Sequence, residues 1–255
     1  WASRLLARKE SAGRFNVNVF ALLAPGFLII MVLVMAGRDL GTTSVIAAIL
    51  AGMLFVSGIQ LRILGWATAA GALALAFLIA TSDYRAQRFL VFLNPFAPED
   101  YKLAGWQPAH SLLGLATGGL FGVGLGGSRQ KWGNLPDAHT DFIFSVIGEE
   151  LGLVGTLAVL ALLGTLIYSM FRIALRAQEP MIRYACAGIA CWFMAQSFLN
   201  IGSATSTLPV VGVTLPLVSY GGSALVASLC AIGFVAGAAL RDPEVRKEIV
   251  KRRGA

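Results

Sequence analysis

Long apolar runs, each bounded by charged or turn-forming residues, constrain the fold of this chain more than any other feature. Several of them reach the ~20 residues that an α-helix needs to cross a hydrocarbon core, and none has the ten-residue alternation of a membrane β-barrel. Charged residues make up 13% of the 255 positions, against about 25% in soluble domains. The sequence therefore predicts an all-α integral membrane protein, folded as a polytopic helical bundle.

Six membrane crossings are expected, within a single membrane domain over residues 1–255. Three fall in residues 18–81 and three in 152–240, with a large loop over 82–148 between them and a tail over 241–255. The individual spans, bounded by charge and turn residues, are 18–37, 41–59, 63–81, 152–172, 185–207 and 222–240.

Basic residues gather on one side of these crossings. Those that flank the spans are Arg4, Arg8, Lys9, Arg14, Arg62, Arg172, Arg176 and Arg183. The positive-inside rule makes that side, together with the tail, cytoplasmic, and it makes the 82–148 loop extracellular. The same distribution accounts for the net charge of +7, so no nucleic-acid partner is expected.

The 82–148 loop is longer than most connections in compact proteins, and such loops are usually functional or disordered. Its stretch GLATGGLFGVGLGGSRQKWG, residues 114–133, is rich in glycine but also in leucine, phenylalanine and tryptophan. That composition is too apolar for a flexible linker. We therefore expect the loop to be ordered and partly packed into the membrane boundary.

The cysteines and histidines form no recognisable metal or disulfide pattern. Cys186, Cys191 and Cys230 all fall inside apolar runs, which predicts buried thiols and no zinc site. His110 and His139 are not spaced as a metal pair, and no nucleotide-binding glycine loop is present. No metal ligands are therefore assigned.

The stretch LPDAHTDFIFSVIGEELGLVG, residues 135–155, carries four carboxylates and a histidine between apolar runs. Pro136 followed by Asp137 is typical of a helix start, because proline suits the first turn and an acid suits the positive end of the helix dipole. A helix that begins there places three residues on one face, at about 100° per residue. They are Asp141, Ser145 and Gly148.

On that helix, Glu149 lies about 80° from Asp141, and Glu150 lies opposite Asp141. Asp141 and Glu149 could therefore line one cavity, with Glu150 pointing elsewhere. The apolar neighbours of Asp141 would raise its pKa toward the range of a general base. The alternative is that these acids cap a helix at the water boundary and pair with Arg129 or Lys131.

Lys131 has a further structural interpretation, because a lysine beside Trp132 is a common anchor at the membrane interface.

A second candidate site lies in AQSFLNIGSATSTLPVVG, where Gln196 and Asn200 share one helix face at a spacing of four residues. Such polar groups need partners in a membrane. They either bond to neighbouring helices or contact a ligand.

A third candidate site is TLPLVSYGGSAL, residues 214–225. Gly221 and Gly222 permit close backbone approach and unusual dihedral angles. Non-helical backbone at membrane depth persists where it is buried or lines a cavity. The segment is therefore either a pocket wall or a tight loop between closely packed helices.

Together, several blocks resemble the SEDS family of shape, elongation, division and sporulation proteins (FtsW, RodA and SpoVE). They are NPF at 94–96, GLFGVGLGGSRQKWGNLPDAHTDFIFSVIGEELGLVG at 119–155, QSFLNIG at 196–202 and LPLVSYGGSAL at 215–225. The resemblance implies a ten-helix fold, in which the six crossings here are the fifth to tenth and Trp1 to Arg4 end the fourth. The N-terminal helices are then expected to be missing from this chain.

The resemblance implies a peptidoglycan glycosyltransferase that polymerises lipid II at the outer face of the bacterial plasma membrane. Asp141 matches the essential loop aspartate of the family and would act as general base. Lys131 and Arg129 are candidates for holding the leaving diphosphate, and a divalent cation, Mg²⁺ or Mn²⁺, could share that role. The other expected substrate-binding residues are His139, Thr140, Glu149, Gln196, Asn200, Ser219, Tyr220, Gly221, Gly222 and Ser223.

KWGNLPDAHTDFIF and LPLVSYGGS are more similar to the FtsW-like division and sporulation branch than to the elongation branch. The resemblance also implies a class B penicillin-binding protein transpeptidase as partner, together with other membrane proteins of the division complex. One rival interpretation is a lipid II flippase, which needs polar residues across the whole bilayer depth. Another is a non-catalytic division scaffold, which would not need Asp141.

Overall fold

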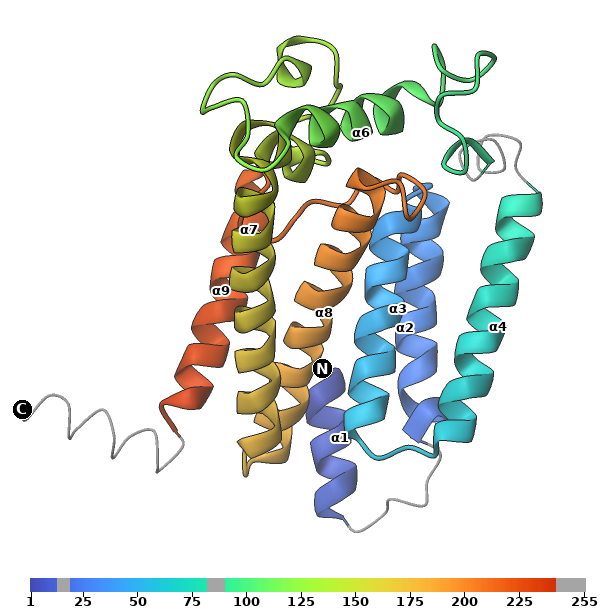
Figure 1. The fold of residues 1–255 in the computed structure, drawn as a ribbon. Helices are drawn as coiled ribbons and strands as arrows, with labels where there is room; N and C mark the ends of the chain where they lie inside the picture. Colours follow the sequence, from blue (N-terminus) through green and yellow to red (C-terminus); the bar gives the residue numbers. More distant parts are fainter. Residues whose placement is uncertain (13–18, 82–89, 242–255) are drawn as a thin grey trace, which may run out of the picture. The chain divides into compact units, whose positions relative to one another are not determined.

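The computed structural model describes residues 1–12, 19–81 and 90–241. Within these ranges the chain forms helices and turns and no strand, so the predicted all-α class is confirmed (Figure 1). The elements are α1 (Ala2–Ser11), α2 (Val19–Ala36), α3 (Leu40–Val56), α4 (Leu61–Ala80), α6 (Trp106–Gly118), the 3₁₀ turn η1 (Gln130–Trp132), α7 (Ile143–Arg176), α8 (Pro180–Ala204) and α9 (Gly222–Ala239).

Each predicted crossing coincides with one of these helices. Helices α7, α8 and α9 are long and apolar enough to cross a membrane, and shorter apolar helices lie within α2, α3 and α4. The largest difference is at α7, which begins nine residues before the predicted start of the span at 152. Arg14, the start of the large loop at 82–89 and the tail after Arg241 lie outside the described residues.

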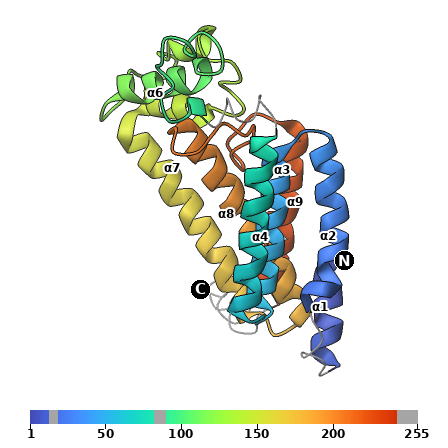
Figure 2. The same cartoon turned by 90° about the vertical axis from the view of Figure 1, so that its right-hand side faces the viewer.

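The chain packs as two compact units. Of the described residues, the first unit contains 1–12, 19–65, 165–195 and 226–241, and the second contains 66–81, 90–164 and 196–225. In the first unit, α2 and α3 lie side by side (Figures 1 and 2). Its core brings α1, α2, α3 and α8 together through Leu6, Leu23, Phe27, Met53, Leu54 and Tyr184.

A polar cluster in the first unit fixes α1 to the start of α8. The Arg183 guanidinium donates to Glu10 Oε2 at 2.6 Å, and the Tyr184 hydroxyl donates to the same oxygen at 2.9 Å. Tyr184 is 1% exposed. An ion pair with so buried a neighbour is better protected from solvent than a surface pair, so the contact orients α1.

The cysteines are free. Cys186 and Cys191 are buried, as predicted, and α3 approaches Cys191 so closely that a Cβ on Gly52 would lie 2.0 Å from its Sγ. Cys230 is exposed on α9, so its predicted burial is wrong. An apolar span can carry a thiol on its outer face, because cysteine behaves there as a small hydrophobic side chain.

In the second unit, α6 lies across the upper end of α7 (Figures 1 and 2). The Ser111 hydroxyl of α6 donates to the carbonyl of Ala204 at 2.7 Å and also shares a hydrogen bond with the Ser145 hydroxyl. One buried serine thus joins α6, α7 and the end of α8. The core beneath it consists of Leu135, Ala138, Phe142, Phe144, Val146, Leu163, Ala204 and Leu215.

Helix α7 is broken at Gly152, whose φ of 66° and ψ of −161° are not helical. In an unbroken helix the amides of residues 153 and 154 would bond to the carbonyls of residues 149 and 150. Here all four groups bond to residues 118–124, which we call the clip segment. The bonds are Leu153 N to Gly119 O at 2.9 Å, Val154 N to Leu120 O at 3.2 Å, Val123 N to Glu149 O at 2.9 Å and Gly124 N to Glu150 O at 3.1 Å.

Glycines allow this contact between two backbones. A Cβ on Gly118 would lie 1.8 Å from the carbonyl oxygen of Gly148, and one on Gly122 would lie 2.1 Å from that of Glu150. A helix break in an apolar setting is tolerated where neighbouring groups satisfy the freed backbone. The glycine-rich stretch of the large loop is therefore an ordered partner of α7, as its apolar composition predicted.

We predict that Gly118→Ala destabilises the protein by about 1–3 kcal/mol, the usual range for overpacking a tight contact. The reason is that the new methyl group would overlap the carbonyl of Gly148. Thermal unfolding in detergent measures the effect. Gly164→Ala is the matched control, because a Cβ there meets nothing within 4 Å; an equal loss of stability in both variants would contradict the close packing.

Candidate active site

The candidate catalytic residue Asp141 lies in a turn before α7. The amides of residues 140, 141 and 142 all donate to the carbonyl of Asp137, at 3.1, 3.0 and 3.2 Å. Asp137 itself has a φ of 56°, in the left-handed region, which asparagine and aspartate tolerate better than most residues. The predicted helix start at Pro136 and Asp137 is therefore wrong, since α7 begins at Ile143.

Three successive carbonyls of this turn each accept a hydrogen bond from α8 or from the segment that follows it. The bonds are Tyr220 N to His139 O at 2.9 Å, Ser219 Oγ to Thr140 O at 2.6 Å and Asn200 Nδ2 to Asp141 O at 2.8 Å. In a helix through the turn, these carbonyls would accept from residues 143–145. Because they bond elsewhere, Asp141 does not share a helix face with Ser145 and Gly148.

The carboxyl group of Asp141 is partly buried and lies beside Gly212. Burial raises the pKa of Asp141, and the negative charge of Asp137 raises it further, in the direction that the apolar neighbours predicted. Gly212 has a φ of 68°, and a Cβ there would lie 3.5 Å from Asp141 Oδ2. A carboxylate with a raised pKa, in a turn fixed at three backbone points, has the character of a general base.

Gln196 and Asn200 lie on one face of α8, as their spacing predicted, and both bond to the segment after the helix. Asn200 Nδ2 donates to the carbonyl of Val213 at 2.7 Å, and Gln196 Nε2 donates to Thr214 Oγ1 at 3.0 Å. Asn200 is 1% exposed, so a substrate has no free surface of this side chain to contact. For Asn200 the structure favours hydrogen bonding within the protein over ligand contact.

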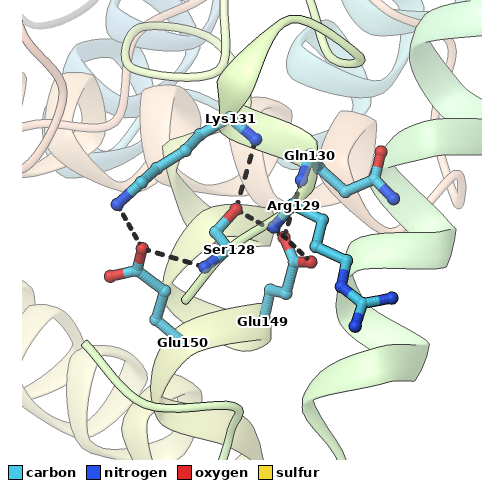
Figure 3. A network of polar contacts seen from close by, with 6 residues as sticks. All are labelled: Ser128, Arg129, Gln130, Lys131, Glu149 and Glu150. Carbon is cyan, nitrogen blue, oxygen red and sulfur yellow. Dashed lines mark hydrogen bonds and ion pairs between the residues drawn. The ribbon is translucent and has the colours of Figure 1, made fainter. Parts of the chain in front are cut away.

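Glu149 and Glu150 both bind the segment of residues 126–131 (Figure 3). Glu149 is 1% exposed, and both of its carboxylate oxygens are occupied. They accept from Ser128 Oγ at 2.5 Å, Arg129 N at 2.9 Å and Gln130 N at 3.3 Å. Glu149 therefore holds this segment in place instead of facing a substrate beside Asp141.

Glu150 forms an ion pair with Lys131 and accepts from the amide of Ser128 at 3.4 Å. Glu150 was predicted to point away from Asp141, and its contacts are with residues 128 and 131. The same segment also binds Glu149, which was expected beside Asp141. The alternative, in which an acid pairs with Lys131, is the one observed. The Lys131 ammonium also lies 5.3 Å from the centre of the Trp132 ring, as expected for an interfacial anchor.

The side-chain charge of Arg129 has no partner among the described residues, unlike that of Lys131. Its amide is bound by Glu149, but its guanidinium has no hydrogen bond or ion pair within the part of the chain that the structure describes. Figure 3 shows the guanidinium extending away from Lys131 and Glu150. Of the two predicted cations, Arg129 is the one whose charge is available to an anionic ligand.

The remaining predicted residues lie in the turn before α7 and around the start of α9. The rings of His139 and Tyr220 meet edge to face with centroids 5.6 Å apart, and Tyr220 is 75% exposed. Gly222 begins α9, and Ser223 is its second, exposed residue. Thr140 is half-buried and donates to the carbonyl of Asp137 at 3.2 Å.

The close backbone approach and unusual dihedral angles expected at Gly221 and Gly222 are not observed, and their contact with a substrate stays a prediction. Neither has a positive φ, and a Cβ would meet only Ala224 Cβ at 3.5 Å in the first case and nothing within 4 Å in the second. The glycine that the site requires is Gly212, which the sequence interpretation missed. Its signal was present, since an isolated glycine in an apolar run indicates close backbone approach.

Ser128 was also missed. It is 1% exposed, its hydroxyl donates to Glu149, and it accepts from the amide of Lys131 at 3.2 Å. Nothing in the sequence distinguishes this serine from its neighbours. Among the described residues, no group of three or more His, Cys, Asp or Glu could hold a metal ion.

The chain matches the model of the FtsW/RodA/SpoVE family, described as cell cycle proteins, over residues 1–242. It is 40% identical over 244 residues to a protein of Mycobacterium tuberculosis named probable peptidoglycan glycosyltransferase FtsW, covering 96% of this chain and 46% of that protein. A protein of the same name from Geobacter metallireducens is 37% identical over 236 residues, covering 92% of this chain and 62% of the relative. The chain thus spans about half to two thirds of these relatives' length.

Two solved structures are similar in fold. One is a chain from a study of how a peptidoglycan synthase complex coordinates polymerization and crosslinking, with a TM-score of 0.72 and 30% identity over 92% of this chain and 64% of that chain. The other is the rod shape determining protein RodA of Thermus thermophilus, with a TM-score of 0.57 and 31% identity over 85% of this chain and 54% of that chain.

We predict that Glu149→Gln disturbs residues 128–130 more than Glu150→Gln does. Glu149 is buried with three donors, and hydrogen bonds to a charged group contribute about 1.5–3 kcal/mol, whereas a partly exposed ion pair contributes about 0–1 kcal/mol. Hydrogen exchange of the amides of residues 128–130, together with thermal unfolding, measures the difference. Equal effects of the two substitutions would mean that the network in Figure 3 does not hold the segment.

Proposed function

This chain belongs to the FtsW/RodA/SpoVE family of cell cycle proteins, and from that premise we propose that the full-length protein is a peptidoglycan glycosyltransferase of cell division that polymerises lipid II. The observation that carries the proposal is the carboxyl group of Asp141, partly buried, with a raised pKa, on a turn bound at three successive carbonyls. The names of its relatives support the reaction class.

In the proposed reaction, the Asp141 carboxylate accepts the proton of the GlcNAc 4-hydroxyl of the acceptor. The oxygen of that hydroxyl forms a bond to the anomeric carbon of the donor MurNAc while the bond from that carbon to the diphosphate-lipid breaks. The configuration at the anomeric carbon inverts. General-base catalysis of this kind contributes about 10²–10⁴-fold to the rate, and a raised pKa makes the base a better proton acceptor.

The leaving diphosphate needs positive charge. Arg129 is our candidate for this role, because Lys131 is paired with Glu150, while Arg129 is exposed and its guanidinium extends away from that pair (Figure 3). Guanidinium groups suit phosphate oxygens, since they offer paired donors. A divalent cation, Mg²⁺ or Mn²⁺, is a second candidate for the same role, although the described residues contain no group of three or more His, Cys, Asp or Glu that could hold it.

We place the protein in the bacterial plasma membrane, with the turn that carries Asp141 on the outer side. The distribution of basic residues supports this orientation. The proposed partner is a class B penicillin-binding protein transpeptidase, within a larger set of division-complex membrane proteins. A chain of a peptidoglycan synthase complex is similar in fold over 92% of the present chain, and this similarity supports that partner.

The rival functions make different demands on Asp141. A scaffold needs no carboxylate with a raised pKa, and a flippase needs a polar path through the bilayer. Asp141 has a raised pKa and lies on a turn bound at three carbonyls. This fixed, partly buried carboxylate supports a catalytic function over a scaffold.

We predict that Asp141→Asn in the full-length protein, with its transpeptidase partner, reduces polymer formation from purified lipid II by about 10²–10⁴-fold. The amide keeps the size of the side chain but cannot accept the proton. Gel separation of the glycan strands measures the product. Thermal unfolding and co-purification of the partner serve as controls for folding and assembly, and wild-type amounts of polymer would eliminate the enzymatic assignment.

A second prediction concerns pH. Because the charge of Asp137 raises the pKa of Asp141, Asp137→Asn lowers the pKa of Asp141. The Asp141 carboxylate then stays ionised to lower pH. The acid limb of kcat/KM against pH, which reports the free enzyme, should move to lower pH. Asp39→Asn is the matched control, since the Asp39 carboxylate accepts from Thr42 N at the start of α3. An acid limb that stays in place in Asp137→Asn would contradict the assignment of the base.

A further inference from the structure

Two buried or partly buried side chains hold the turn that carries Asp141. Of its three bound carbonyls, one accepts from a backbone amide and two accept from side chains, Asn200 and Ser219. These side chains come 59 and 79 residues after the carbonyls that they bind. The position of Asp141 therefore depends on a small number of long-range contacts.

The orientation of the Asn200 amide is determined by its partners. Nδ2 donates to the carbonyl oxygens of Asp141 at 2.8 Å and Val213 at 2.7 Å. Carbonyl oxygens only accept, so the nitrogen must face them and both of its protons are committed. With 1% of the residue exposed, Asn200 cannot donate to a sugar without releasing the turn.

Ser219 is committed in the same way. Its hydroxyl donates to the carbonyl of Thr140 at 2.6 Å and accepts from the amide of Leu215 at 2.7 Å. A hydroxyl has a single proton, and here that proton is used on the turn. Both side chains also bind the segment of residues 213–215, which continues from Gly212 beside the Asp141 carboxylate.

We propose that Asn200 and Ser219 are positioning residues, which fix the Asp141 carboxylate relative to the residue 212–220 segment, and that neither contacts the substrate. The inference rests on the proposed function and assigns a role within the same site. Asn200, from α8, bonds to both the turn and Val213, and Ser219 bonds from the segment to the turn. Two side-chain contacts therefore set the distance between the turn that carries Asp141 and this segment. A misplacement of about 1 Å at a reacting group can cost about 10²-fold in rate.

The test uses the full-length protein with its transpeptidase partner and compares Asn200→Ala, Ser219→Ala and Ser219→Thr. We expect kcat for lipid II polymerisation to fall about 10²-fold in the two alanine variants, with KM unchanged. Ser219→Thr keeps the hydroxyl and should restore most of the lost kcat. Because burial is the main cause of the raised pKa of Asp141, a loosened turn admits water, so the acid limb should move to lower pH in both alanine variants.

Ser203→Ala is the matched control. Ser203 is 5% exposed, one turn from Asn200 on α8, and its single hydroxyl proton is within reach of the carbonyl oxygens of Leu199 at 2.8 Å and Pro209 at 3.1 Å. Removal of this hydroxyl breaks a buried hydrogen bond to the stretch between α8 and α9 but leaves the contacts of the turn that carries Asp141 unchanged. We expect a lower melting temperature but an unchanged kcat per folded molecule and an unchanged acid limb.

Three results would overturn the inference. The first is a raised KM with wild-type kcat in the alanine variants, which would mean that these side chains contact the substrate. The second is wild-type kinetics in both of them while Asp141→Asn is inactive. The third is a loss of kcat that leaves the acid limb in place and that Ser219→Thr does not restore.

Two other outcomes separate a folding defect, and a failure of the proposed function, from the positioning role. If Asn200→Ala yields no folded protein, the comparison of Ser219→Ala with Ser219→Thr decides alone, since Ser219 is less buried. An active Asp141→Asn would instead remove the proposed function, and with it the premise of this inference.

Discussion

The hydrogen bonds that draw the carbonyls of residues 139–141 away from α7 are the constraint on which the site depends. A backbone carbonyl in an apolar setting must have a partner, and these three have theirs in α8 and in the segment before α9. As a result, the helix begins at Ile143 and Asp141 remains in a turn. The carboxylate is thereby placed against Gly212 and kept from the helix face that it would otherwise occupy.

At the break in α7 at Gly152, backbone groups likewise leave the helix and bond to another segment of the chain. Four backbone groups leave the helix ladder, and the clip segment of residues 118–124 satisfies all of them. The short helical piece between Ile143 and the break is thus held at both ends by parts of the chain distant in sequence. Glu149 adds a side-chain contact from this piece to residues 128–130, which in turn presents the Arg129 guanidinium (Figure 3).

The apolar spans were predictable because their signal is local. Helices α2, α3 and α9 end within a few residues of the expected boundaries, since charge and turn residues mark where an apolar run stops. The turn before α7 was not predictable in this way. Pro136 and Asp137 carry the local signals of a helix start, but partners 59 and 79 residues later withdraw the carbonyls that such a helix would use.

The same limit applies to the site. The sequence indicated Asp141 through its apolar neighbours and its place in a family motif, and burial raises the pKa of Asp141 in the predicted direction. The positive φ beside its carboxylate belongs to Gly212, whereas the sequence analysis had singled out Gly221 and Gly222. Glu149 was expected beside Asp141, and Asn200 was left open between hydrogen bonding and ligand contact, because burial and hydrogen-bond partners cannot be derived from spacing on a helical wheel. Each is 1% exposed and bonded within the protein.

The most direct measurement is the single-turnover rate of glycosidic-bond formation by the full-length protein, at saturating lipid II, for the wild type and for the variant in which asparagine replaces Asp141. With binding saturated, the rate reports the chemical step alone. The account predicts a rate lower by about 10²–10⁴-fold when the carboxylate is lost. Equal rates in equally folded samples would contradict it, because the proton of the attacking hydroxyl would then have another acceptor.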